Sequence, residues 1–556
     1  MKLGRRISVT LLNAKNWRTP FGIMLLVFFI TPRLTSAQAL TTGSISGSVV
    51  DPQGGLLPGV SITATHQPTG TTYEAVTNGE GRFEIFSVRV GGPYRVAAAL
   101  SGFRDQTEAV ETVGLGENRT IEFKLTLASV TENVTVTAEV PNIDSTRAGT
   151  AANIRSETIE NLPSISRSMF DYARTSPFVS LNQDSAGAEQ VINVAGRNNR
   201  YNNMQIDGAV NNDVFAISSS STPGSAAGTQ PISLDVIQEV QIAISPYDVR
   251  QGGFSGGSVN AVTKSGGNAF GGTGYWFQRN QALVGDLPSL TSVANPTPTD
   301  TKVGTFSDKQ GGFSFGGPIM QNKAFFFGNF DTGRKTTPTG YSLDGASGQP
   351  WLHTAEVQQI LDIAKNQYEY DAGGLGEVST PQKNNKYFLR TDYNLGLKHQ
   401  LTARVNYIDA SLQRTTSGIP SNLNYAMPND YYFQKNKNLG VVGQLNSTFG
   451  GGYNEFRIGY NRIRDARELP TPIFPYVQVD LADGNSVRLG SENSSHANAL
   501  DQDIVEVTND FTLVRGNHTL TIGTHKECFK FWNLFLQNLY GNYRFDSAAF
   551  YQQGLA

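Results

Sequence analysis

The chain has 556 residues, which exceeds one ordinary domain and is compatible with about three. Charged residues make up 16% of the chain and aromatic residues 10%, and 58 residues are glycine, so the composition favours many β-strands with tight turns over a helical enzyme. The formal net charge of −3 argues against nucleic acid as a partner, because chains that bind nucleic acid usually carry a strong basic excess.

The N-terminal residues have the pattern of an export signal. Basic residues precede the apolar run FGIMLLVFFI (21–30), and a small-residue cleavage pattern ends at Ala37. This predicts a signal peptide over residues 1–37. The apolar run is too short to span a bilayer as a helix, which takes about 20 residues, and an uncleaved signal anchor is the alternative. No later segment reaches that length, so membrane residence must use β-strands.

Residues that bind metals or form disulfides are sparse. Cys528 is the only cysteine, which excludes an intrachain disulfide, and the 6 histidines are scattered without a metal-binding spacing. Asp and Glu are common, but no pair stands in an identifiable catalytic context, which makes a sugar-active enzyme a weak alternative. We therefore expect no metal, no cofactor and no enzymatic activity.

Residues 42–128 predict a small β-sandwich. About seven short alternating segments, including 94–99 and 120–125, are separated by turn signals. In TTYEAVTNGEGRFEIFSV, Asn78-Gly79 predicts a hairpin between the flanking segments. The stretch VDPQGGLLPGVSI, followed by TNGEGRFEI, resembles the carboxypeptidase regulatory-like domain, a carbohydrate-binding-like sandwich; the resemblance does not extend to the zinc peptidase itself.

Residues 129–144 form a polar linker around a short β-prone stretch. Val134, Val136 and Ala138 alternate there with Thr135 and Thr137. Such a stretch can add itself as a strand to the sheet edge of a partner. The alternatives, a last strand of the sandwich or a plain linker, stay open.

Residues 145–266 differ in character from the sandwich. Short helices are predicted at 156–163, ended by Pro163, and at 167–174. VINVAGRNNRYNNMQIDGAVNNDVF predicts a strand, a polar loop and a second strand that ends at Asp207-Gly208, and 234–246 predicts another strand. This unit is therefore α+β.

The glycine-rich stretch QGGFSGGSVNAVTKSGGNAFGG (251–272) closes this unit. A phosphate-binding loop needs glycine directly before Lys-Ser, and Thr263 stands there, so we set a nucleotide site aside. The central residues predict a short strand, with Val259, Ala261 and Thr263 on one face and Ser258, Asn260, Val262 and Lys264 on the other. The glycines allow close packing where a Cβ would clash.

Residues 267–556 predict the strands of a transmembrane β-barrel. In KYFLRTDYNLGLKHQLTARVNYIDA, an apolar and aromatic face alternates with a polar face that carries Arg390, Asp392 and Arg404. Similar hairpins recur at 311–335, 439–462 and 511–523; a soluble sandwich would also alternate, but the recurrence favours the membrane. The long polar pieces at 284–308 and 336–384 predict extracellular loops, with disordered linkers as the alternative.

Several ordered motifs of residues 145–266 resemble the plug domain of TonB-dependent outer-membrane receptors. GRNNRYNNMQIDGA is similar to the arginine–asparagine–IDG motif of the plug, and VIQEVQIAISPYDVRQGGFSGGSVNAVTKSG is similar to its end. TKSGGNAFGGTGYWFQRN resembles the Oar-like branch of that family. The matching residues are Arg197, Asn203, Ile206, Asp207, Gly208, Gly256, Gly257, Thr263 and Lys264.

The resemblance implies roles for these residues. Arg197, Asn203, Asp207 and Gly208 are expected to hold the plug and its contacts to the barrel wall, and not to touch a substrate. Asp207-Gly208 is expected to be a turn, and Lys264 a contact between plug and wall.

The resemblance also implies a function: ligand-gated import across the bacterial outer membrane. The sandwich would lie in the periplasm, outer-membrane lipid would surround the barrel, and TonB would pair with Val134–Ala138 and transmit energy from the inner-membrane proton gradient. The ligand is open, with carbohydrate and peptide both compatible. The alternative is an outer-membrane adhesion or surface-organising protein, with a sandwich that binds glycan or protein and no active uptake.

The predicted fold is thus mainly β: an N-terminal sandwich, an α+β plug and a partial transmembrane antiparallel barrel. Receptors of the family close about 22 strands around the plug, whereas residues 267–556 suffice for about a dozen strands of roughly ten residues. We therefore expect an incomplete chain; a complete, smaller barrel is the alternative.

Overall fold

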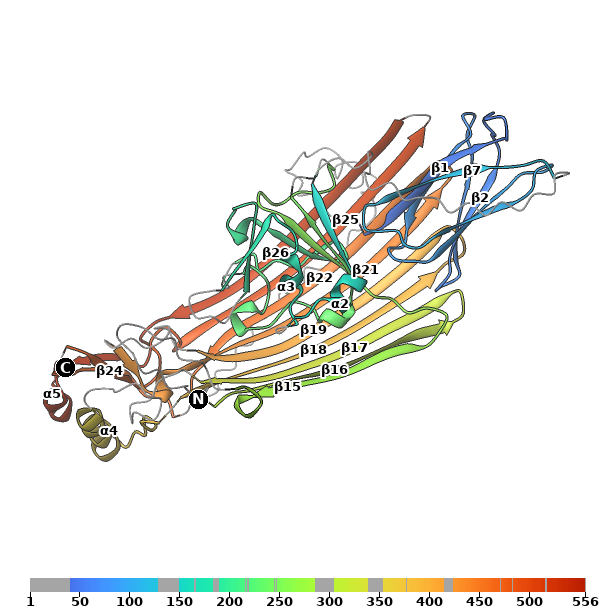
Figure 1. The fold of residues 1–556 in the computed structure, drawn as a ribbon. Helices are drawn as coiled ribbons and strands as arrows, with labels where there is room; N and C mark the ends of the chain where they lie inside the picture. The colour runs from blue at the N-terminus through green and yellow to red at the C-terminus, as the bar shows by residue number, and fades with distance from the viewer. Residues whose placement is uncertain are drawn as a thin grey trace, which may run out of the picture.

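In the computed structural model the chain is mainly β and consists of a sandwich, a plug, a curved wall of strands and a small cap (Figure 1). The structure describes residues 41–128, 150–285, 305–338, 354–414, 424–515 and 518–555, apart from gaps at 165–166, 184–189, 216, 218–219, 245, 247, 377, 471 and 483. The predicted signal peptide and the segment Val134–Ala138 lie outside the described residues.

The N-terminal unit is a two-sheet β-sandwich, as predicted. Its strands are β1 (Gly43–Val50), β2 (Ser61–His66), β3 (Thr71–Val76), β4 (Arg82–Val88), β5 (Tyr94–Ala99), β6 (Gln106–Val110) and β7 (Asn118–Lys124). The two sheets have the orders β4-β1-β7 and β3-β2-β5-β6. Ile45, Ile62 and Phe123 are fully buried in the core, because alternate side chains of each strand face the opposite sheet.

The predicted hairpin around Asn78-Gly79 is wrong. β3 pairs with β2 and β4 pairs with β1, so the chain crosses between the sheets at this turn. The turn itself is well formed, since Asn78 Oδ1 accepts hydrogen bonds from the backbone amides of Glu80 (2.9 Å) and Arg82 (3.0 Å). A turn signal reports the local backbone and does not determine which strands pair.

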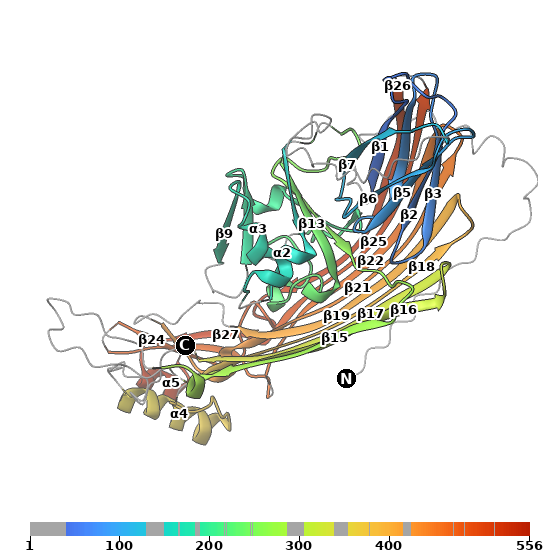
Figure 2. The ribbon, with the colours of Figure 1, turned by 45° about the vertical axis from the view of Figure 1, so that its right-hand side comes forward.

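The second unit, residues 150–264, is called the plug below because it lies against the concave face of the wall (Figure 2). Its elements are β8 (Ala151–Arg155), α2 (Ser156–Asn161), α3 (Met169–Ala173), β9 (Val179–Gln183), β10 (Gln190–Val194), η1 (Asn199–Tyr201), β11 (Asn203–Ile206), β12 (Ala209–Val210), η2 (Ser225–Ala227), η3 (Leu234–Val236), β13 (Ile237–Ala243) and β14 (Ser258–Thr263). The main sheet has the order β12-β11-β14-β13-β8. The helices α2 and α3 fall within the two predicted helical segments.

The wall is one antiparallel sheet of nine strands in the described part of the chain. They are β15 (Gly271–Asn280), β16 (Ser307–Met320), β17 (Ala324–Pro338), β18 (Ser379–Asn394), β19 (His399–Arg414), β21 (Tyr432–Phe449), β22 (Gly452–Glu468), β25 (Ala497–Arg515) and β26 (His518–Leu536), with the short η4 (Gln281–Leu283) after β15. Along β18 the side chains of Tyr387 and Leu389 are exposed, whereas Phe388 and Asp392 are buried on the plug side. This is the predicted alternation of an apolar outer face and a polar inner face.

In the part of the chain that the structure describes, the wall strands are fewer and longer than predicted, with lengths from 10 to 19 residues. A strand advances about 3.3 Å per residue, so the longest reach roughly 60 Å and exceed the ~30 Å hydrocarbon core of a bilayer. Among the described residues the sheet is open, with β15 and β26 at its two edges.

The two ends of the wall differ. At one end, called the turn end, strands are joined by the short connections 321–323, 395–398, 450–451 and 516–517. The connections at the other end, the loop end, are much longer. The sandwich lies at the turn end (Figures 1 and 2).

The connections at the loop end contribute to a folded cap. Its elements are α4 (Thr354–Tyr368), β20 (Asn424–Ala426), η5 (Pro428–Asp430), β23 (Tyr476–Asp480), β24 (Ser486–Leu489), β27 (Asn542–Phe545) and α5 (Ala548–Gln553). Three separate connections and the segment after β26 contribute side chains to one buried core, including Ile360, Met427, Val487 and Tyr551. The segment 336–384, predicted as loop, therefore contains a packed helix.

In the part of the chain that the structure describes, no helix combines the length and the apolar character needed to cross a membrane.

Candidate functional site where sandwich, plug and wall meet

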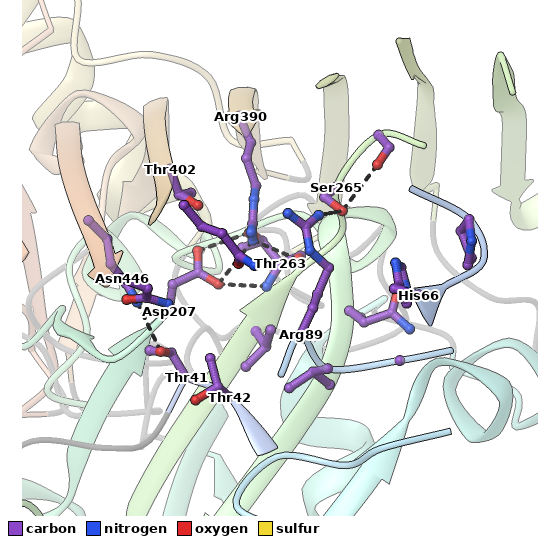
Figure 3. Close-up of a pocket in the computed structure, with 18 of the residues that line it drawn as sticks. Thr41, Thr42, His66, Arg89, Asp207, Thr263, Ser265, Arg390, Thr402 and Asn446 are labelled. Atoms are coloured by element: carbon purple, nitrogen blue, oxygen red, sulfur yellow. Dashed lines mark hydrogen bonds and ion pairs between the residues drawn. The ribbon is translucent and has the colours of Figure 1, made fainter. Parts of the chain in front are cut away.

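A cavity of about 180 Å³ lies at the junction of the three larger units (Figure 3). The sandwich, the plug and the wall each contribute to its lining; examples are Arg89 from the sandwich, Asp207 and Thr263 from the plug, and Arg390 and Thr402 from the wall. The charged residues among them are interlinked, and their links hold one unit to another.

Asp207 is placed by a tight turn between β11 and β12. Its φ is +46° and that of Gly208 is +69°, a left-handed pair that Asp and Gly tolerate better than most residues. The Asp207 carboxylate accepts hydrogen bonds from the backbone amide of Thr263 (2.8 Å) and from its hydroxyl (2.9 Å). The turn thus fixes this carboxylate at the end of β14, as the predicted Asp-Gly turn requires.

Two wall arginines neutralise the Asp207 carboxylate. Arg404 Nε lies 2.9 Å from Asp207 Oδ2, and an Arg390 terminal nitrogen lies 3.6 Å from Oδ1. Arg390 also donates to the carbonyl oxygen (3.0 Å) and the hydroxyl (2.8 Å) of Thr263. Arg404 is 5% exposed and Asp207 is 6% exposed, so these charges are withdrawn from water and depend on each other.

The ion pairs continue to the sandwich. Asp392, which is 2% exposed, lies 2.8 Å from Arg390 and 3.3 Å from Arg89. Arg89 also donates to the hydroxyl of Ser265 at 2.6 Å. We call the series Arg404–Asp207–Arg390–Asp392–Arg89 the ion-pair chain. It alternates in charge and joins wall, plug and sandwich.

His66 of the sandwich lines the same cavity. Burial, together with the positive charge of Arg89, lowers the pKa of His66 to about 3. Its Nδ1 is 2.7 Å from the hydroxyl of Thr69. The imidazole is therefore neutral at physiological pH and adds no charge to the ion-pair chain.

The structure brings four of the residues matched to plug motifs to this site. Ile206, Asp207, Gly208 and Thr263 lie together, with the carbonyl of Ile206 accepting a hydrogen bond from Arg404 and the amide of Gly208 donating to Asn260 Oδ1 at 3.0 Å. Ile206, Asp207 and Thr263 connect the plug to the wall through polar contacts, and Gly208 holds the turn to β14 within the plug.

Three other matched residues lie at the opposite end of the β11–β14 pair. The amide of Asn203 donates to the carbonyl of Gly257 (2.9 Å), and its side chain donates to the carbonyl of Gly252 (3.2 Å). A Cβ on Gly256 would clash with the side chain of Asn202, and one on Gly257 would lie 2.6 Å from Val194 Cγ1. These residues support the fold of the plug and lie away from the ion-pair chain.

The last two matched residues do not join the site. Arg197 is exposed in a turn after β10, where its amide donates to the carbonyl of Val194. Lys264 Nζ lies 3.4 Å from Glu160 of α2, within the plug, so the predicted contact between Lys264 and the wall is wrong. The carboxylate partner of Lys264 comes from a helix that the strand pattern around it does not reveal.

Sequence reasoning placed Arg390, Asp392 and Arg404 on the polar face of the wall but did not assign them to a site, and it missed Arg89. Arg390 and Arg404 are direct cross-strand partners on β18 and β19. Like charges in direct opposition are destabilising unless an anion lies between them. Two arginines at inner positions of one hairpin are therefore a signal for an inserted carboxylate.

Comparisons with known proteins agree with this architecture. Residues 44–126 match the carboxypeptidase regulatory-like domain, and residues 262–345 and 357–556 match the outer membrane beta barrel domain. The TonB-dependent transporter Oar of Myxococcus xanthus is 24% identical over 299 residues, which cover 53% of this chain and 27% of Oar.

Similar solved structures include the outer membrane transporter YddB from Escherichia coli (TM-score 0.48, 15% identity, 68% of this chain and 48% of YddB). Another is the siderophore receptor PirA from Acinetobacter baumannii (TM-score 0.45, 14% identity, 69% of this chain and 49% of PirA). The chain spans half or less of the length of each of these relatives. The match to the outer membrane beta barrel domain covers half of the residues of this chain, so the chain belongs to that family.

Proposed function

We propose that this chain is part of a TonB-dependent receptor that imports a ligand across the outer membrane. The observation that carries the proposal is the buried carboxylate of Asp207, which comes from the plug and lies against Arg390 and Arg404 of the wall. Two wall phenylalanines, Phe327 and Phe388, also join the apolar core of the plug. The ion pairs and hydrogen bonds around Asp207 can break and form again, so this part of the contact allows the plug to move. The similarity of the chain to the transporter Oar supports the same function.

The proposed coupling segment is Val134–Ala138. The next described strand is β8, an edge strand of the plug sheet that pairs only with β13 in the described sheet. In outer-membrane barrels short turns face the periplasm, so the turn end and the sandwich would face TonB. TonB would pair with Val134–Ala138 as an added strand and transmit force to the plug through β8.

The test is binding of the purified C-terminal domain of TonB to the full-length protein in detergent. Proline removes backbone donors and blocks strand pairing, so V134P/V136P should lose most of the binding. Ser145→Pro, outside the segment, is the matched control and should bind as the unmodified protein does. Equal binding by V134P/V136P would refute the assignment of the segment, and absence of binding by the unmodified protein would refute import.

A further inference from the structure

The sandwich precedes the first strand of the plug in the chain and also contacts it. The chain leaves the sandwich after β7 and enters the plug at β8, and the proposed TonB segment lies between them in sequence. A pull on that segment therefore acts on two anchored ends, the sandwich and β8. Contacts between these two ends decide whether the pull can separate them.

The first contact is a set of hydrogen bonds to the backbone of Leu115 in the β6–β7 loop. The amide of Leu115 donates to Glu239 Oε1 (3.2 Å), and its carbonyl accepts from Asn153 Nδ2 (3.1 Å) and Gln241 Nε2 (2.9 Å). Leu115 is fully buried, and Glu239 and Gln241 are 2% and 4% exposed. Side chains of β8 and β13 thus hold the backbone of one sandwich residue on both sides of its Cα atom.

Two further contacts surround this peptide. Arg155 of β8 forms an ion pair with Glu117 of the sandwich at 3.3 Å. Leu115 packs with Val90 and Val262 in a small buried apolar cluster. Both polar side chains that β8 directs to the sandwich, Asn153 and Arg155, are therefore engaged.

The sandwich is also attached to the wall. The carbonyl of Pro68 accepts from the amide of Asn268 at 2.7 Å, just before β15, and Asn394 Nδ2 donates to the hydroxyl of Thr71 at 2.9 Å. The rings of Phe86 and Tyr453 stack with their centroids 5.5 Å apart. The sandwich therefore bridges the boundary between plug and wall at the turn end.

We propose that the sandwich is a second gate of the receptor: it must undock from β8 before the plug can move relative to the wall. This proposal rests on the proposed import function. A packed domain that is bonded to both sides of a boundary prevents sliding until one set of bonds breaks. β8 is the first described strand after the pulled segment in sequence, so we expect its contacts with the sandwich to break first.

Arg89 couples this gate to the ion-pair chain. While docked, it shares the neutralisation of Asp392 with Arg390. When the sandwich leaves, Arg390 must neutralise Asp392 as well as Asp207, which weakens its hold on the plug. Undocking of the sandwich thus prepares release of the plug.

A reversible covalent lock tests the gate. A Cβ on Gly114 would lie 3.3 Å from Asn153 Nδ2, and Gly114 has no positive φ, so we choose G114C/N153C as the cysteine pair. The new Cβ would also lie 2.6 Å from Glu117 Oε2, so the flexible Glu117 side chain must shift. Thiol titration first verifies that the disulfide forms. The exposed native thiol is removed by Cys528→Ser. The full-length protein in a supported bilayer is pulled with the C-terminal domain of TonB, and extension of the plug is recorded.

We expect TonB to bind both redox states but to extend the plug only after reduction, with at least a tenfold loss of extension events in the oxidised state. G114C/C528S and N153C/C528S, treated identically, should extend in both states. Equal extension by the oxidised and reduced double-cysteine protein would overturn the gate and leave import intact. Absence of TonB binding in both states would instead refute the import function.

Variants that weaken the docking contacts of the sandwich test the gate independently, through the rate of plug extension. Glu117→Gln and Arg89→Gln should raise the rate of plug extension at constant force at least fivefold. The matched control is Asp105→Asn at an exposed position of the sandwich, which should leave the rate of plug extension unchanged. Unchanged extension rates in both interface variants would overturn the proposal.

Discussion

Arg390 and Arg404 face each other directly across β18 and β19, and a carboxylate from a different unit separates their charges. The wall hairpin by itself would bring together two like charges in a poorly solvated place. The plug relieves this repulsion with Asp207. Without Asp207 the wall would hold two adjacent positive charges with no anion between them. The attraction between Asp207 and these arginines therefore holds the plug to the wall.

Asp207→Asn should loosen the plug. The substitution leaves Arg390 and Arg404 without a shared anion, and removing one partner of a buried pair costs about 3–5 kcal/mol. Hydrogen exchange of the β11 and β14 amides in the full-length protein should accelerate, while Asp105→Asn leaves it unchanged. In a double-mutant cycle, the loss of unfolding free energy in D207N/R404Q should be smaller than the sum of the losses in the two single variants. If the free-energy losses of the two single variants simply add, Asp207 and Arg404 do not interact, which would contradict the ion pair.

Gly257→Ala should destabilise the plug by about 1–3 kcal/mol, because the new methyl group would overlap the side chain of Val194, a branched residue with little freedom to move. Gly440→Ala is the matched control, since a Cβ at that wall position meets nothing within 4 Å. Proteolytic cleavage of the plug in the two variants measures the difference. Equal cleavage rates would show that the close approach has no energetic consequence.

Docking of the sandwich on the plug should weaken as the pH rises from about 4.5 to 7. Burial raises the pKa of Glu239 to about 7, an effect opposed by the Leu115 amide and Arg155 and increased by Glu117. A carboxyl group with a raised pKa in the docked state binds a proton that the undocked state has released, so its contribution is present below about pH 4.5 and lost through pH 7.

Glu239→Gln should abolish this pH dependence, because the neutral amide can still accept from the Leu115 amide. Hydrogen exchange of the β6–β7 loop at pH 5 and pH 8 measures it, after correction for the intrinsic exchange rate. A pH dependence that persists in the variant would assign the effect to another group.

The cap should lose stability as the pH rises from about 4 to 8. Burial raises the pKa of Asp430 to about 8, nearby Glu492 contributes in the same direction, and Arg488 at 3.7 Å opposes it. In the folded cap this carboxyl group stays protonated up to about pH 8, so its contribution to stability is complete below the ordinary carboxyl pKa and is lost as the pH rises to 8. Asp430→Asn should therefore protect the cap from proteolysis at pH 9 and change little at pH 5. Equal protection at both values would contradict this explanation.

Much of the architecture was predictable from local patterns. Alternation along residues 387–407 placed Tyr387 and Leu389 outward and Asp392 inward, because a strand directs successive side chains to opposite faces. The Asp207-Gly208 turn was predictable because these two residue types tolerate a left-handed backbone. The hairpin at Asn78-Gly79 and the contact of Lys264 were wrong, since each depends on a partner that is distant in sequence.

The sequence by itself determined the units: a β-sandwich, an α+β plug and membrane strands with a polar inner face. These follow from the period of apolar residues and from turn residues, which act over a few positions of the chain. Only the tertiary structure decided that Arg89, Asp207 and Arg404 belong to one ion-pair chain, and that three connections and the segment after β26 fold into one cap. These contacts join residues up to hundreds of positions apart, and buried charges select their partners by position in space.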